Sequence, residues 1–152
     1  MHCADERPST SFLYTLSIGA APAFASYDDY LTDDKLFVFQ SNTIRELAKQ
    51  GPCVFIGRCA DYVLRQQPGM LSVFIHAPLE QRVLRVARLY NIDEDKARAR
   101  IRKTDKTRAN YYNYYADGDW GRADRYDIAL NTGKLPIPIA AQLLADAAKL
   151  VK

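Results

Sequence analysis

One segment of the sequence, residues 98–115, gathers basic side chains around a single carboxylate. Six basic residues surround Asp105 and lead into four tyrosines: Arg98, Arg100, Arg102, Lys103, Lys106 and Arg108. Burying unpaired guanidinium groups costs more free energy than packing returns, so this composition does not suit a core. Each arginine fork can bind two phosphate oxygens at once. The lone carboxylate could orient such a fork or accept hydrogen bonds from a sugar, and the segment therefore predicts a phosphate-binding element.

The same segment has a second interpretation, a solvated helix face covered by long charged side chains. The tyrosine run and the glycine-containing exit at residues 118–125 favour the phosphate-binding interpretation. For Tyr111, Tyr112, Tyr114 and Tyr115, stacking on nucleic-acid bases and packing along a helix with surface hydroxyls both remain open. RNA binding would need aromatic and basic residues interleaved across a sheet face, and that pattern is not visible.

A second candidate is the pair Gly57-Arg58. It follows Cys53–Ile56, a wholly apolar run between turn signals that is typical of a buried parallel strand. Ligands of α/β proteins bind beyond the carboxyl ends of the strands, so Arg58 would lie at such an end. An exposed arginine in a tight turn explains the position equally well.

The remaining elements must position these residues. Helical patterns span Asp33 to Gly51, Pro78 to Tyr90, Ile92 to Tyr115 and Pro138 to Val151. Two further strands are expected at Leu71–Ile75 and Tyr126–Asn131. Strands that alternate with helices predict an α/β protein with a parallel sheet, and 152 residues predict one domain. Three strands make a thin sheet for this architecture.

Charge and cysteine content restrict the class of partner. The net charge is only +3, yet ten basic residues face five acidic ones between Glu80 and Arg108. A local basic face fits a small anionic ligand better than a nucleic-acid polymer. Three cysteines and two histidines show no metal-ligand spacing, and we expect no metal site in the chain itself. The odd cysteine count, the acidic N-terminus and the lack of an apolar run of ~18 residues predict a cytoplasmic protein with no membrane partner.

No phosphate-binding P-loop of the form G-x-x-x-x-G-K-[ST] occurs in the sequence. Five residues separate Gly51 from Gly57, and Arg58-Cys59 follows. Gly133-Lys134 continues into Leu135 and has no glycine at the required distance upstream. The glycine-rich loop that would hold the outer phosphates of a nucleoside triphosphate is therefore not in this chain.

Four stretches resemble the cytidylate kinase-like family of nucleoside monophosphate kinases: S-F-L-Y-T-L-S from Ser11, G-P-C-V-F-I-G-R-C-A-D-Y-V-L from Gly51, K-T-D-K-T-R-A-N-Y-Y-N-Y-Y from Lys103, and Y-D-I-A-L-N-T-G-K-L from Tyr126. The resemblance covers nearly the whole chain from Ser11. It implies a P-loop kinase fold, a parallel sheet flanked by helices with a lid at about residues 98–125. Set against the family, the chain lacks the N-terminal strand and P-loop, and we expect an N-terminally incomplete domain over residues 1–152.

The resemblance also implies an activity and site residues. The activity is transfer of the γ-phosphoryl group of ATP, as a magnesium complex, to CMP or dCMP. Gly57 and Arg58 match the pair whose arginine reaches the bound monophosphate, and Asp105 and Arg108 match the D-x-x-R that meets the acceptor nucleotide. Related enzymes carry an arginine four residues before the aspartate, where this chain has Ile101. Arg100, Arg102 and Lys103 are candidates to supply that phosphate contact. His76 stands where those enzymes have an aspartate.

Two functional hypotheses follow. The first is a cytidylate kinase-like enzyme of which this chain, without the P-loop, has little or no activity by itself. The alternative is a non-catalytic nucleotide-binding or interaction module. An incomplete sheet exposes an edge and apolar surface, so self-association is also expected.

Overall fold

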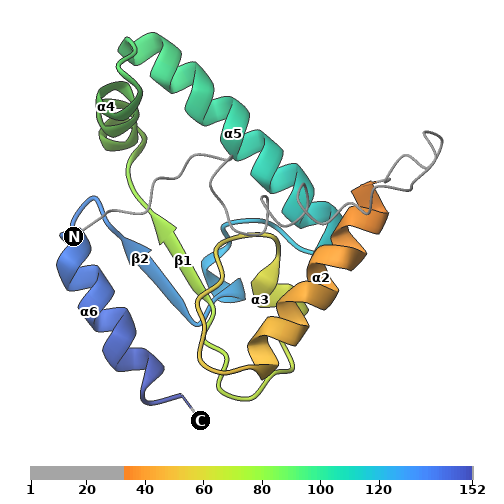
Figure 1. The fold of residues 1–152 in the computed structure, drawn as a ribbon. Helices are drawn as coiled ribbons and strands as arrows, with labels where there is room; N and C mark the ends of the chain where they lie inside the picture. Colours follow the sequence, from red (N-terminus) through yellow and green to blue (C-terminus); the bar gives the residue numbers. More distant parts are fainter. Residues whose placement is uncertain (1–32, 152) are drawn as a thin grey trace. The chain divides into compact units, whose positions relative to one another are not determined.

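The computed structural model describes residues 33–151 (Figure 1). The chain divides into two compact units, one ending at Cys53 and the other beginning at Val54. The Ser11–Ser17 stretch of the family resemblance lies outside the described residues, as do the rest of the N-terminal segment and Lys152.

The described part of the first unit is the helix α2, Asp33–Lys49. Asp33 and Asp34 lie in its first turn and Lys49 in its last, which matches acidic and basic charges to the two ends of the helix dipole. The helix ends shortly before Gly51, whose φ of 144° lies outside the range of ordinary helices. The predicted helix is therefore confirmed.

The second unit is built on a two-stranded parallel sheet. Strand β1, Val73–His76, pairs with β2, Ile128–Asn131, in a register that joins Val73 to Ile128 and His76 to Asn131. At the amino ends, Asp127 Oδ2 accepts hydrogen bonds from Ser72 N (2.8 Å) and Ser72 Oγ (2.7 Å). At the carboxyl ends, the His76 carbonyl accepts from Thr132 N at 2.9 Å. Both predicted strands are confirmed.

The third predicted strand, at Cys53–Ile56, is not present in the structure. These residues have no regular secondary structure, and the side chains of Val54 and Ile56 are 90% and 84% exposed. Cys53 is exposed as well. A strand needs a neighbour that accepts and donates its backbone hydrogen bonds, and within residues 33–151 the sheet consists of β1 and β2 alone. Self-association through this apolar surface stays a prediction.

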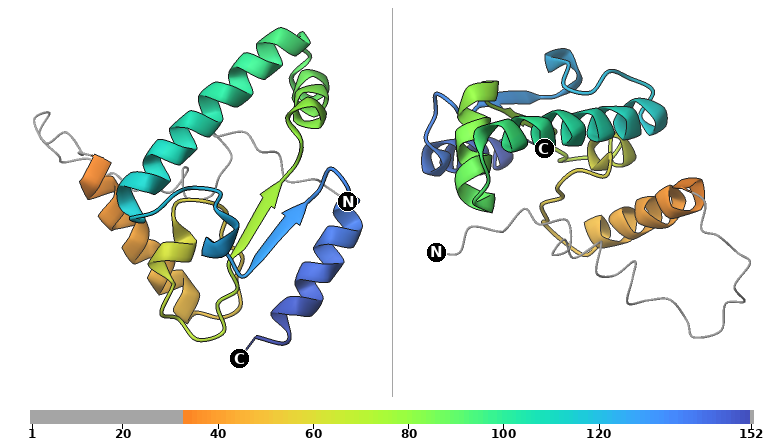
Figure 2. Two further views of the ribbon diagram at one scale, coloured as in Figure 1. Left: turned by 180° about the vertical axis from the view of Figure 1, so that it is seen from behind. Right: turned by 90° about the horizontal axis from the view of Figure 1, so that it is seen from above.

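Two helices that cross at a large angle connect the strands and form an arm (Figure 1). Helix α4, Leu79–Tyr90, ends at Asn91 in the left-handed conformation, and α5, Glu94–Tyr115, begins after Asp93, which accepts a hydrogen bond from Lys96 N at 2.8 Å. The buried centre of the arm contains Val83, Ala97 and Ile101. Figure 2 shows the arm from two further sides. Both helices agree with the sequence prediction.

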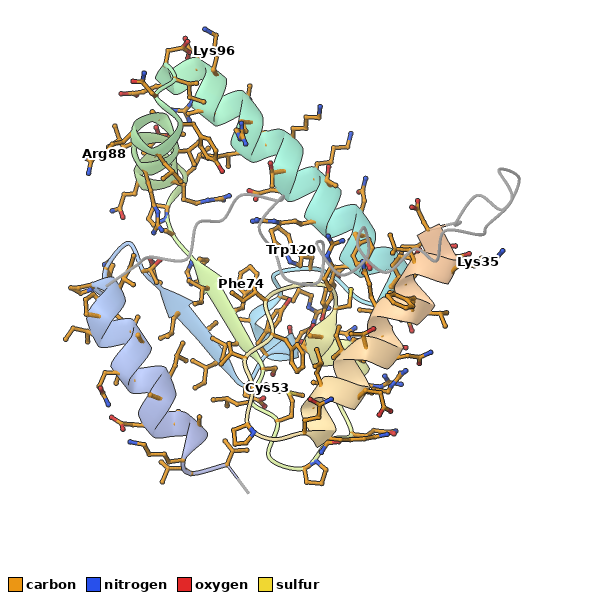
Figure 3. All side chains as sticks on the ribbon, in the orientation of Figure 1. Lys35, Cys53, Phe74, Arg88, Lys96 and Trp120 are labelled. Carbon is orange, nitrogen blue, oxygen red and sulfur yellow. The ribbon has the colours of Figure 1, made fainter. Side chains whose placement is uncertain are left out.

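Shorter elements complete the second unit. Helix α3, Ala60–Val63, follows the Gly57-Arg58 turn, the 3-10 helix η2 spans Ala123–Arg125, and α6, Ile137–Ala148, follows β2. The α5–β2 loop packs on the sheet through aromatic rings. Phe74 of β1 lies 5.0 Å from Tyr126 and 5.6 Å from Trp120 between ring centroids (Figure 3). None of the helices between residues 33 and 151 is long and apolar enough to cross a membrane.

Candidate phosphate-binding site

One face of α5 carries the two principal site residues. Ile101, Asp105, Arg108 and Tyr112 follow one another at spacings of four, three and four residues, which places them on a single stripe of the helix. Ile101 is buried in the core of the arm, and Tyr112 is buried at the other end of the stripe. Asp105 and Arg108 therefore lie between two packed positions of this stripe, where Asp105 is half-buried and Arg108 is exposed.

Asp105 is oriented by an arginine from the other helix of the arm. Arg82 Nη2 of α4 donates to Asp105 Oδ1 at 2.7 Å, and the two side chains are 33% and 26% exposed. A partly buried ion pair of this kind restricts the carboxylate to few orientations. Sequence reasoning counted Arg82 among the basic residues but did not assign it to the site. Its neighbour Val83, which packs in the core with Ile101, is the signal that would have placed it there.

Two of the six basic residues of the segment stabilise the arm. Arg98 donates to both carboxylate oxygens of Glu80, at 2.8 and 2.5 Å, and this pairing lowers the pKa of Glu80. The guanidinium of Arg100 lies 3.9 Å from the centroid of the Tyr90 ring, a cation–π contact. Within residues 33–151, ion pairs are absent from the other four: Arg102, Lys103, Lys106 and Arg108.

Helix geometry separates Arg102 from Lys103. At about 100° per residue, Arg102 lies roughly 60° from Asp105 around the helix, whereas Lys103 lies roughly opposite. Both side chains are exposed. The structure thus pairs Arg82 with Asp105 and places Arg108 on the same stripe of α5, with Arg102 at its flank and Lys103 on the far side of the helix.

The Gly57-Arg58 turn has an unusual backbone. Gly57, Arg58 and Cys59 have φ values of 71°, 57° and 54°, three consecutive residues in the left-handed region. Arg58 is half-buried, and the turn leads directly into α3. Cys59 is only 3% exposed, and burial, followed by the charge of Asp61, raises the pKa of its thiol to about 12. Such a thiol is not a nucleophile at neutral pH.

A hydrogen bond joins this turn to α5. Tyr112 Oη donates to Asp61 Oδ2 at 2.6 Å, and burial together with this bond holds the pKa of Tyr112 far above its ordinary value. Arg58 stands three residues before Asp61, and Arg108 stands one helical turn before Tyr112. Along the chain, both arginines are therefore within four residues of a side chain in this contact, which lies at the end of α5 that approaches α3 (Figure 1).

The remaining tyrosines mostly contact one another. The rings of Tyr111 and Tyr115 lie 4.9 Å apart, and those of Tyr114 and Tyr115 meet edge to face at 4.7 Å. Tyr112 is buried, whereas Tyr114 is 72% exposed. These contacts favour helix packing over a row of rings that stack on bases.

The fold and the site define a mixed α/β protein with a parallel sheet and a helical arm rich in basic side chains. The sequence comparison identifies the particular family. The profile of the cytidylate kinase-like family matches residues 1–134, and the chain belongs to that family.

The relatives agree with this assignment. A cytidylate kinase of Methanopyrus kandleri is 32% identical over 98 residues, which cover 59% of this chain and 51% of that protein. A cytidylate kinase of Methanocaldococcus jannaschii is 29% identical over 105 residues, which cover 67% of this chain and 58% of that protein. The chain thus spans little more than half the length of these relatives.

A solved structure has the same fold. It is the crystal structure of an uncharacterized protein from Eubacterium ventriosum, which superposes with a TM-score of 0.73 at 31% identity. The superposition covers 80% of this chain and 77% of that chain.

Proposed function

We propose that this chain contributes the acceptor-nucleotide site of a cytidylate kinase-like phosphotransferase, in which Arg58, Asp105 and Arg108 bind CMP or dCMP. The observation that carries the proposal is one stripe of α5, on which Asp105 pairs with Arg82 and Arg108 lies one helical turn before Tyr112, the residue that contacts Asp61 beyond the Arg58 turn. Membership of the family supports the choice of nucleotide.

The proposed chemistry needs positioning and charge neutralisation rather than covalent help from the protein. The guanidinium groups of Arg58 and Arg108 would bind the monophosphate oxygens and offset the charge that gathers during transfer. Asp105, whose Oδ1 accepts from Arg82, would use its carboxylate to accept hydrogen bonds from the nucleoside. Arg102 would add a further cation at the flank. Lys103 would need a change in α5 to reach the same ligand.

ATP and magnesium belong to the proposal as one substrate. Within residues 33–151 no group of three or more His, Cys, Asp or Glu side chains could hold a metal ion. We therefore assign no resident magnesium site to the described part of the chain, and the ion would arrive with ATP. Because the 152 residues contain no P-loop motif, we expect this chain by itself to bind CMP but to transfer little or no phosphate.

Calorimetry with CMP tests the acceptor site. The unmodified chain should release heat of binding, and Arg58→Ala and Arg108→Ala should each weaken binding at least tenfold through loss of a charge-assisted hydrogen bond. Arg88→Ala is the matched control, because it removes one positive charge from an exposed position near the far end of the arm (Figure 3). Equal losses in all three variants, or no binding by the unmodified chain, would contradict the proposal.

A coupled assay of ADP release tests the second part of the proposal. With ATP, magnesium and CMP, the chain should give only the background rate. Turnover at ordinary kinase rates of about 1–100 per second would refute the role assigned to the missing P-loop.

The alternative function is a nucleotide-binding module without catalysis, and the lack of a P-loop motif favours it. Both functions predict CMP binding, so the coding sequence upstream of residue 1 is the observation that distinguishes them. An in-frame strand, glycine-rich loop and helix encoded before residue 1 would give a longer protein that phosphorylates CMP. An expressed protein that begins at Met1 would support the non-catalytic nucleotide-binding module.

A further inference from the structure

The Gly57-Arg58-Cys59 turn carries backbone strain that its own residues do not relieve. Arg58 and Cys59 both adopt the left-handed conformation, which costs a residue other than glycine about 1–2 kcal/mol. Helix α3, which follows, has only four residues, and Cys59 provides no side-chain cap at its start. A helix of one turn has almost no stability of its own. Contacts from elsewhere in the fold must hold the turn in place.

The Asp61–Tyr112 hydrogen bond is such a contact. Asp61 is the second residue of α3, and its Oδ2 accepts from the Tyr112 hydroxyl at 2.6 Å. Tyr112 is itself fixed, because it is only 9% exposed and its ring lies 6.4 Å from the ring of Tyr126. Tyr126 in turn stacks on Phe74 of the sheet. Packed contacts thus connect α3 through α5 to β1.

The chemistry of the pair suggests more than a structural role. A partly buried carboxylate and a buried hydroxyl lose hydration that a pair of apolar side chains would not lose. Glycine at position 58 would relieve strain in the turn, but it would also remove the guanidinium group. An arginine in a strained turn, joined through Asp61 and Tyr112 to the helix that carries Arg108, is an arrangement suited to direct two cations at one anion.

We propose that Asp61 and Tyr112 are positioning residues whose hydrogen bond holds the Arg58 turn against α5, so that the guanidinium groups of Arg58 and Arg108 converge on the phosphate of one nucleotide. This inference rests on the proposed function, because it concerns the same acceptor site. Neither Asp61 nor Tyr112 needs to touch the ligand.

The binding test compares CMP with cytidine, which lacks the phosphate. Tyr112→Phe keeps the ring but removes the donor, and Asp61→Ala removes the acceptor. Each should weaken CMP binding about tenfold, the lower end for a hydrogen bond to a charged group. Binding of cytidine should change little, because the bond acts through the phosphate-binding arginines. Asp61→Asn keeps an acceptor oxygen and should recover part of the loss, and the double variant should be no worse than the single ones.

Equal weakening of CMP and cytidine would overturn the inference, because it would show general disruption of the site. Tyr114→Phe is the matched control. It removes a hydroxyl from the same helix at a position that is 72% exposed, and it should leave the affinity for both ligands unchanged.

Cys59 provides a second readout that does not depend on nucleotide binding. In a chain that carries Cys3→Ser and Cys53→Ser, Cys59 is the only thiol, and its rate of reaction with Ellman's reagent reports opening of the turn. Tyr112→Phe should raise that rate at least fivefold, and Tyr114→Phe should not. An unchanged rate would overturn the inference even if CMP binds. If the unmodified chain fails to bind CMP, the proposed function is refuted. An increased Cys59 rate would then show that the Asp61–Tyr112 hydrogen bond only stabilises the turn, and the positioning role would be refuted as well.

Discussion

Replacing Arg82 by methionine and Asp105 by asparagine, singly and together, tests whether the arm orients the carboxylate of the proposed site. Methionine keeps an unbranched apolar stem at position 82, and asparagine is nearly isosteric with aspartate. The double-mutant cycle isolates the interaction between the two side chains from the other effects of each replacement. Free energies of unfolding from urea titrations of the four proteins give the coupling energy.

The structure sets the expected size of this coupling. Two unit charges about 4 Å apart attract each other by roughly 4 kcal/mol at an effective dielectric constant of about 20. The pair is 33% and 26% exposed, so solvent screening and the loss of hydration offset most of that attraction. Fully exposed pairs contribute about 0.2–1 kcal/mol, whereas breaking a fully buried pair costs about 3–5 kcal/mol. We therefore expect a coupling energy of about 1.5 kcal/mol.

Salt provides the internal check on the electrostatic origin of the coupling. At an ionic strength of about 1 M the Debye length falls to about 3 Å, so the coupling should decrease but should not vanish for a partly buried pair at 2.7 Å. A coupling energy below about 0.3 kcal/mol at low salt would show that the Arg82–Asp105 pair behaves as an exposed ion pair that adds little to stability. The carboxylate would then not be oriented by α4, and Arg82 would have no place in the site.

Three further predictions concern the rest of the second unit. When each is the sole remaining thiol, Cys59 should react with Ellman's reagent at pH 8 at least tenfold more slowly than the exposed Cys53. The reason is that a pKa of about 12 leaves little thiolate at Cys59. Equal rates would contradict the burial of Cys59. Hydrogen bonds from Ser72 lower the pKa of Asp127 in the folded chain. The stability that this carboxylate adds is therefore present above its unfolded pKa of about 3.9 and is lost as the pH falls through the lower folded value. The urea midpoint of the unmodified chain should drop more steeply below pH 4 than that of Asp127→Asn. Gly133→Ala should lower the free energy of unfolding by about 1–3 kcal/mol, because its Cβ would lie 2.5 Å from the ring carbon Cδ of Pro78. Gly118→Ala should lower it less, because its Cβ meets the movable end of the Arg125 side chain. The reverse order in urea titrations would contradict the packing at Gly133.

Local patterns in the sequence were sufficient to predict most elements of the second unit. The signals are Pro78 ahead of α4 and the acidic residues from Asp93 ahead of α5, which act within a few residues of each helix start. The two apolar runs around β1 and β2 were equally clear. These signals do not depend on which residues lie nearby in space, so they remain readable in a single sequence.

Pairing between distant residues was not predictable in the same way. The apolar run Cys53–Ile56 has strand composition, yet composition does not supply a neighbouring strand, and Val54 and Ile56 remain exposed. Arg82 and Asp105 are separated by 23 positions, and Asp61 and Tyr112 by 51. No periodic pattern relates positions so far apart. The sequence therefore identified Asp105 and Arg108 as site candidates but missed the partners that orient the site.

The contacts also support a small ligand rather than a polymer as the proposed partner of the segment with six basic residues. Arg98 binds Glu80 and Arg100 packs on Tyr90, so two of the six cations stabilise the arm itself. Lys103 lies on the side of α5 opposite Asp105. The stripe from Ile101 to Tyr112 is about 16 Å long at 1.5 Å per residue, and both of its ends are packed. A nucleic-acid strand would need cations along an open, continuous track. The short stripe between two packed ends instead supports the proposal of one compact anion, which Arg108 of α5 and Arg58 would bind together.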